Sequence, residues 1–166
     1  MPVLRTGRLL LRPVTYTDLP ELARLKSDPL AFAQMLGGVR TPREAAEELA
    51  DEQRYWAIHG VGLWAVREAA GGPLVGLTGL HDRADGRSPA LRFAFRATHT
   101  GRGYAREAAG AALRHAHGCG VGLVYAVARE DNIASRTVLG AIGMRQVDTF
   151  DRAGTAMMVY ESRQQG

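Results

Sequence analysis

Residues 100–105, Thr-Gly-Arg-Gly-Tyr-Ala, constrain the fold most strongly, because two glycines stand directly before an alanine-rich run. The apolar run Ala90–Phe95 ahead of them predicts a strand. Behind them, small residues recur at helical spacing and predict a helix that packs close to a sheet: Ala105, Ala108, Ala109, Ala112, Leu113 and Ala116. A strand, a glycine-rich turn and a helix start expose successive N–H groups that suit a phosphate or pyrophosphate.

Two of the known phosphate-binding patterns do not fit this stretch. A Walker-type loop requires Gly-Lys followed by Ser or Thr, and the chain has no such tripeptide. A dinucleotide-binding fold needs its glycines after the first strand and an acidic residue about 20 residues further on. Here the glycines lie past mid-chain, and no Asp or Glu stands between Glu107 and Glu130. An acyl-CoA pyrophosphate loop and a ligand-free turn remain.

The other elements are expected from local signals. Strands are predicted at 8–14, on both sides of the Gly-Gly-Pro turn within 63–80, at 123–128 as a buried strand, and on both sides of residues 151–154. Helices are predicted from Thr17 or Asp18, from Thr41 to His59, after Tyr104, and from Asp131 or Asn132 to Gly143. Hairpins followed by strand–helix units indicate a mixed, mostly antiparallel sheet with helices on both faces, which makes one three-layer α/β domain over residues 1–166.

Composition excludes several classes of protein. With 46% hydrophobic and 23% charged residues, the chain is typical of a globular protein, and no apolar run approaches a membrane span. Cys119 is the only cysteine, which excludes an internal disulfide and suits the cytoplasm. The net charge is +4, but the basic residues are scattered, so we expect no nucleic-acid partner. The loop segment His-Asp-Arg-Ala-Asp at 81–85 is too short to predict a metal site.

Segments 93–113 and 128–144, FAFRATHTGRGYAREAAGAAL and AREDNIASRTVLGAIGM, resemble the GNAT superfamily of acyl-CoA N-acyltransferases. Segments 5–25, 62–68 and 73–80 are also similar to its RimJ/RimL-type branch of protein N-terminal acetyltransferases. The resemblance therefore covers nearly the whole chain. It implies acetyl-CoA as cosubstrate and a sheet whose middle strands splay apart.

The resemblance also implies a set of cofactor contacts. The family pattern Gln/Arg-x-x-Gly-x-Gly/Ala falls on Thr100, Gly103 and Ala105, and Thr100 departs from it. Asn132 matches an asparagine that reaches the pantetheine, although it could equally be a helix cap, and Arg136 could approach a phosphate. Backbone groups of Phe95, Arg96 and Ala97 are expected to pair with the pantetheine. The expected phosphate loop consists of Gly101, Arg102, Gly103, Tyr104, Ala105 and Arg106.

The chain lacks the acid and base residues that many members of this family carry. Many relatives carry Glu-x-Gly-Tyr on the strand before the loop, whereas this chain has Ala90 and Arg92 at the glutamate and glycine positions. Leu139 stands where other relatives have a tyrosine acid. Ser135, with Asn132, is the catalytic candidate that the RimL-type pattern implies, and it could protonate the leaving thiolate or simply cap or pack. His81 and Asp82 are further acid–base candidates.

The absence of a carboxylate at position 90 limits which amines the enzyme can use as acceptor. At pH 7 roughly a tenth of an α-amine is neutral, against about four in ten thousand for a lysine side chain. The difference is about 3 kcal/mol of deprotonation that a base would have to supply. We therefore expect a low-pKa amine, either a peptide N-terminus or a small-molecule amine such as an amino sugar or drug. A non-catalytic acyl-CoA-binding module is the alternative class, and a monomer or homodimer is expected.

Overall fold

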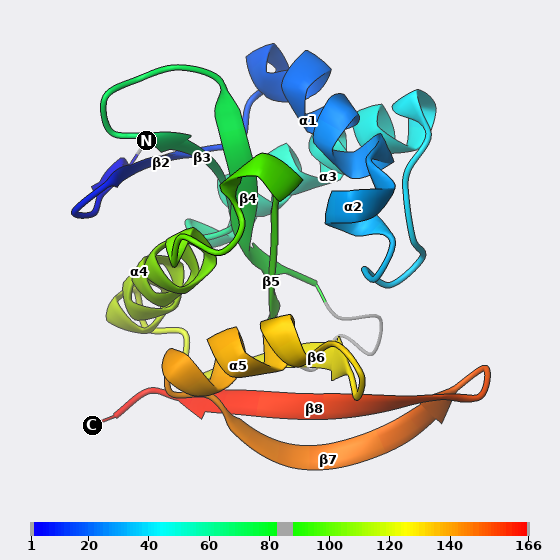
Figure 1. The fold of residues 1–166 in the computed structure, drawn as a ribbon. Helices are drawn as coiled ribbons and strands as arrows, with labels where there is room; N and C mark the ends of the chain where they lie inside the picture. Colours follow the sequence, from blue (N-terminus) through cyan, green and yellow to red (C-terminus); the bar gives the residue numbers. More distant parts are fainter. Residues whose placement is uncertain (1, 83–87, 166) are drawn as a thin grey trace.

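The computed structural model describes residues 2–82 and 88–165 (Figure 1). Its helices are α1 (Leu19–Ser27), α2 (Pro29–Phe32), α3 (Pro42–His59), α4 (Tyr104–Gly118) and α5 (Ile133–Ala141), with short 3₁₀ turns η1 (Tyr16–Asp18) and η2 (Ala97–His99). Its strands are β1 (Leu4–Arg5), β2 (Leu9–Pro13), β3 (Leu63–Glu68), β4 (Leu74–His81), β5 (Ala90–Phe95), β6 (Leu123–Arg129), β7 (Arg145–Arg152) and β8 (Thr155–Arg163). No helix in the described part of the chain is long and apolar enough to cross a membrane.

The strands of the described residues form one eight-stranded sheet in the order β1-β2-β3-β4-β5-β6-β8-β7. Neighbouring strands are antiparallel except β5 and β6, which run parallel. Six residue pairs join β5 to β4, but a single pair, Ala90 and Tyr125, joins β5 to β6. The sheet therefore splits between β5 and β6, and the split widens toward the carboxyl ends of both strands.

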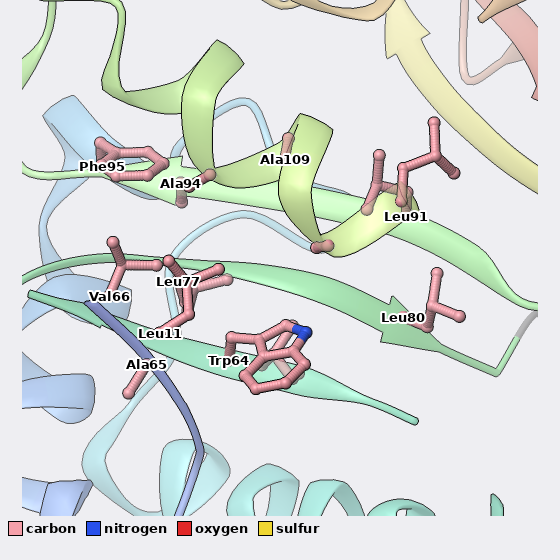
Figure 2. Close-up of a cluster of buried hydrophobic side chains, with 14 of the residues drawn as sticks. Leu11, Trp64, Ala65, Val66, Leu77, Leu80, Leu91, Ala94, Phe95 and Ala109 are labelled. Atoms are coloured by element: carbon pink, nitrogen blue, oxygen red, sulfur yellow. The ribbon is translucent and has the colours of Figure 1, made fainter. Parts of the chain in front are cut away.

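Helices cover both faces of the sheet. Helices α1, α2 and α3 lie on one side, and α4 lies on the other together with α5, which packs on β6 (Figure 1). The buried side of α4 is made of small residues, and Ala108 and Ala109 are fully inaccessible. Figure 2 shows Ala109 next to β5, which carries Leu91, Ala94 and Phe95. The α/β architecture expected from the sequence is thus confirmed.

Helix α3 begins and ends where its sequence signals place it. The Thr41 hydroxyl accepts the Glu44 N–H, the Glu44 carboxylate accepts the Thr41 N–H, and Pro42 takes the first helical position. Gly60, with φ +69°, closes the helix in the left-handed conformation. Such end signals are local, so tertiary context does not override them.

Three details differ from expectation. Strand β1 and helix α2 carry no periodic pattern, because they have only two and four residues, and the sequence did not reveal them. Strand β6 was expected to be buried, yet only one face is: Val124, Ala126 and Ala128 are buried, and the alternate residues are half-exposed. The cause is that α5 packs on one face of β6, while the split separates β6 from β4 and β5, the strands that α1 and α2 cover on the other face of the sheet.

Candidate active site

The split between β5 and β6 forms a slot lined by backbone groups. The N–H of Arg96 donates to the Val75 carbonyl at 2.9 Å, so even-numbered residues of β5 pair with β4. Backbone groups alternate in direction along a strand, which turns those of Phe93 and Phe95 toward the slot. Of the three residues expected to pair with pantetheine, Phe95 directs its backbone groups toward the slot, whereas the Arg96 N–H is bonded to Val75. Ala97 begins η2, and its carbonyl accepts the hydroxyl of Thr100 at 2.9 Å.

The glycine-rich loop lies at the mouth of this slot and ends in the start of α4. Gly101 and Gly103 have φ of +76° and +79°, a conformation that L side chains rarely adopt. The first N–H bonded within α4 belongs to Glu107, which donates to the Gly103 carbonyl at 3.0 Å. The N–H groups of Tyr104, Ala105 and Arg106 therefore project from the helix start, where the helix dipole favours an anion. This geometry fits a pyrophosphate.

Arg8, directly before β2, anchors the loop, and nothing in the sequence pattern indicated this role. Its Nε is 2.9 Å from Glu107, one Nη donates to the Arg102 carbonyl at 2.8 Å, and its guanidinium lies 4.7 Å from the centre of the Tyr104 ring. Glu107 also accepts the hydroxyl of Thr6 and the N–H of Arg8. The carboxylate in the first turn of α4 is thus neutralised from the turn between β1 and β2, which lowers its repulsion of a bound phosphate.

The start of α5 lies across the slot from the loop. The Asn132 side-chain oxygen accepts the Ser135 N–H at 3.2 Å and caps the helix. Capping uses only the oxygen, so the amide N–H₂ of Asn132 is left to bind a ligand. Arg136 donates to the Tyr160 hydroxyl at 3.1 Å and to the Glu130 carbonyl at 3.0 Å, contacts that fix β6, α5 and β8 together.

A cavity of about 510 Å³ continues from the slot toward α3. Asn132, Ser135 and Leu139 line one end, and Glu48, His81 and Arg92 line the other. Apolar side chains complete the wall: Met35, Leu36, Phe93, Phe150 and Met157. The cavity joins the groups expected at the thiol end of the cofactor to a polar region on the opposite face of the sheet.

That polar region is a network of charged side chains on α1, α3, β5 and the loop before α3. Lys26 is fully buried and lies 2.9 Å from Glu48 and 3.2 Å from Glu52. Arg40 is 2.7 Å from Glu48, and Arg92 is 2.5 Å from Glu52. Each carboxylate thus has two cationic partners. We call Lys26, Arg40, Glu48, Glu52 and Arg92 the ion network.

The ion network keeps Glu48 ionised. Burial raises the pKa of Glu48, but hydrogen bonds from Arg40 and Lys26 and the positive charges of Lys26 and Arg92 outweigh burial, so the pKa is lowered overall. A carboxylate held in this way is a poor proton acceptor. The network therefore supplies charge and shape to the cavity rather than a free base.

His81, at the end of β4, lines the same cavity. Its Nδ1 is 3.0 Å from the Asp82 carbonyl oxygen. Burial and the neighbouring Arg92 cation lower the pKa of His81 to about 4, so the ring is neutral at physiological pH. Of the segment 81–85, residues 83–85 lie outside the described residues; among those described, no group of His, Cys, Asp and Glu side chains is arranged to hold a metal ion.

A split sheet with an anion-binding helix start at the split is the arrangement of an acyltransferase that takes its acyl group from acyl-CoA. The family model described as acetyltransferase (GNAT) domain matches residues 8–145. The chain therefore belongs to the GNAT acetyltransferase family and uses acetyl-CoA as its acetyl donor.

Solved structures with the same fold cover the whole length of the chain. An acetyltransferase from Agrobacterium tumefaciens is 25% identical with a TM-score of 0.85, over 99% of this chain and 95% of that one. A protein from Bordetella pertussis assigned to the GnaT family is 24% identical with a TM-score of 0.83, over 97% and 99%. RimL, a ribosomal L7/L12 alpha-N-protein acetyltransferase in complex with coenzyme A, is 14% identical with a TM-score of 0.80, over 98% of each chain.

Proposed function

We propose that this acetyltransferase acts on the α-amine at the N-terminus of a protein or peptide. The observation that carries the proposal is the state of the carboxylates lining the cavity. Glu48 is bound by Lys26 and Arg40, and Ala90 stands where relatives carry a glutamate. Asp82, the other carboxylate among the described residues that line the cavity, is exposed to solvent at the end of β4, so the described site offers no buried, unpaired carboxylate to deprotonate a strongly basic amine.

The energetic consequence separates the two common amine classes. A lysine ammonium at neutral pH must lose a proton at a cost of about 3 kcal/mol more than an α-ammonium does. Without a base of suitable pKa that cost stays in the activation barrier, where it corresponds to roughly a hundredfold in rate. An α-amine brings its own neutral fraction and needs no such base before it attacks.

Most of the predicted site residues have a role in this proposal. The projecting N–H groups of the loop hold the pyrophosphate, and the backbone groups of Phe95, with the Asn132 amide, hold the pantetheine. The neutral amine then attacks the thioester carbonyl from the α3 side of the cavity. The Ser135 hydroxyl, in the same cavity, protonates the departing thiolate.

RimL motivates the choice of acceptor, since it acts on the α-amine of a ribosomal protein. The same reasoning leads us to propose that residues 1–166 work as one domain in the cytoplasm, where newly made protein N-termini are present. Arg136 remains a candidate phosphate contact only through donors not engaged by Tyr160 and Glu130.

A small-molecule amine is the second candidate, favoured by the dimensions of the cavity. A volume of about 510 Å³ and a mostly apolar wall with a few polar groups are typical of sites for drug-sized ligands. An amino sugar or drug with a low-pKa amine would meet the same chemical requirement as a peptide N-terminus.

The test is release of free thiol from acetyl-CoA with three matched acceptor sets. These are peptides with a free α-amine and no lysine, the same peptides N-terminally blocked with one internal lysine, and a panel of amino sugars. We expect turnover with the first set at least a hundredfold above the second at pH 7. Equal turnover of the first two sets, or turnover confined to the third, would contradict a protein α-amine as acceptor.

A further inference from the structure

His81 faces the position where a catalytic carboxylate is missing. In the antiparallel pairing of β4 and β5, His81 lies directly opposite Ala90. Directly opposed residues share a face of the sheet, with Cβ atoms about 5 Å apart. Arg92, two residues along β5 on that face, contacts Glu52 of α3. His81 and Ala90 therefore both belong to the α3 side of the sheet, and both line the cavity.

The hydrogen bond of His81 determines which ring nitrogen can accept a proton. A carbonyl oxygen can only accept, so the contact of 3.0 Å to Asp82 assigns the proton of the neutral ring to Nδ1. Nε2 then carries the lone pair. The Asp82 backbone thus fixes the tautomer, as a positioned general base requires.

From this geometry we propose that His81 is the general base of the reaction, taking the place of the carboxylate absent at position 90. The inference rests on the proposed acetylation of an amine. Nε2 of His81 accepts a proton from the nitrogen of the acceptor amine after that nitrogen has attacked the thioester, not before.

The proton balance of the step is simple. The lone pair of the neutral amine forms the C–N bond at the thioester carbonyl carbon, whose oxygen takes up the negative charge. The nitrogen, now positively charged, gives one proton to Nε2 of His81. The C–S bond then breaks as the carbonyl re-forms, and the thiolate takes a proton from Ser135. His81 returns its proton to Ser135 through solvent, which leaves an amide and a free thiol.

The charges around His81 suit this late role. Burial is the main cause of the lowered pKa of His81, and the positive charges of Arg92 on β5 and Lys26 on α1 add to it. Glu48 of α3 and the Asp82 carbonyl favour the charged ring but do not outweigh these effects. Glu52 of α3 binds both cations, and Tyr55 of the same helix lines the adjoining pocket with His81. A weak base cannot deprotonate an ammonium in solution, but it can accept the far more acidic proton of the tetrahedral adduct. The ring is also neutral, and so able to accept a proton, at every pH above the acidic range.

Three variants test His81. His81→Asn keeps an amide N–H that can donate to the Asp82 carbonyl but has no lone-pair nitrogen, so it separates structure from proton transfer. His81→Ala removes both. His81→Ala with Ala90→Glu restores a carboxylate on the paired position of the neighbouring strand. His117→Asn, at the far end of α4, makes the same replacement outside the cavity and is the matched control.

Acetylation of a lysine-free peptide is measured together with the melting shift that acetyl-CoA produces. We expect His81→Asn and His81→Ala to lose about 10²–10³-fold in kcat/KM with an unchanged melting shift. Ala90→Glu, added to His81→Ala, should raise kcat/KM at least tenfold above that of His81→Ala alone. For the wild type, kcat/KM should follow the ionisation of the amine with no further step near pH 6.5.

The outcomes separate the two proposals. Wild-type turnover with full activity of His81→Asn overturns the role of His81 and leaves the proposed function intact. Absence of wild-type turnover with every amine overturns both. An unfolded His81→Ala leaves the His81→Asn comparison decisive, and equal losses in His81→Asn and His117→Asn count against a specific role.

Discussion

Removal of the Glu52 charge should destabilise the fold through the ion network. In the wild type, Lys26, Arg40 and Arg92 carry three positive charges against the two carboxylates of Glu48 and Glu52. Glu52→Gln keeps the size of the side chain but leaves three cations with one carboxylate. Lys26 is fully inaccessible, so the excess charge cannot be solvated by water.

The expected magnitude follows from burial. Loss of one partner from a buried ion pair costs about 3–5 kcal/mol, because an uncompensated charge stays in the interior. For a domain of this size 1 kcal/mol corresponds to roughly 2–4 °C, so Glu52→Gln should melt about 6–20 °C below the wild type. Lys26→Met leaves Arg40–Glu48 and Arg92–Glu52 as complete pairs and should cost far less. The double variant restores the wild-type excess of one positive charge and should be more stable than Glu52→Gln alone.

Thermal and urea unfolding at pH 7 measure these differences. The control is Glu47→Gln on the same helix, whose partner Arg43 is 90% exposed; its effect should stay within about 0.5 kcal/mol. The reasoning is refuted if Glu52→Gln unfolds within 1 kcal/mol of the wild type. It is also refuted if Lys26→Met adds to the loss in the Glu52→Gln background.

Three further outcomes are expected. Gly103→Val places a branched side chain at φ +79° and against Arg8. In the wild type, acetyl-CoA at a hundred times its Kd should stabilise the fold by about 2.7 kcal/mol, and this increase in melting temperature should vanish in the variant. An unchanged increase would show that the pyrophosphate binds elsewhere. Arg8→Ala frees the loop and removes the cationic partner of Glu107, so KM for acetyl-CoA should rise about tenfold with kcat retained, as steady-state kinetics would show. Because the pKa of Glu48 is lowered in the folded state, the unfolded chain binds a proton at a higher pH than the folded chain does. The free energy of unfolding should therefore fall as pH drops below about 4.5 and stay level above it. Urea unfolding at a series of pH values measures this, and a free energy of unfolding that does not change below pH 4.5 would contradict it.

Elements with strong local signals could be predicted from the sequence. The capping box and closing glycine of α3, the glycines before α4 and the Asn132 cap of α5 all specify their ends within a few residues. Strand β1 and helix α2 are too short for a periodic pattern, and they exist because neighbouring elements hold them. The half-exposed face of β6 depends on the split of the sheet, which no local window contains.

The acceptor side of the site was beyond sequence reasoning for a different reason. Lys26, Glu48, Glu52 and Arg92 are spread over 67 positions, and each alone is typical of a solvated surface. Only the packing of α1 on α3, with Glu52 of α3 in contact with Arg92 of β5, joins them. Arg92 was the one visible signal, since an arginine replaces a glycine of the related pattern and a buried cation requires partners. Arg8 carried no such signal.

The ion network and the missing carboxylate are two aspects of one arrangement. Arg92 occupies the position next to Ala90 on the α3 face of β5, and a glutamate at position 90 would lie within reach of that guanidinium. The arginine would hold such a carboxylate ionised, as Arg40 and Lys26 hold Glu48. A carboxylate at position 90 would therefore be ionised and able to accept a proton at neutral pH, but only as a weak base, and the neutral imidazole of His81 already supplies a weak base at that place. On this reasoning Ala90→Glu in the otherwise wild-type chain should leave activity within a few-fold of the parent, and should gain importance only when His81 is absent.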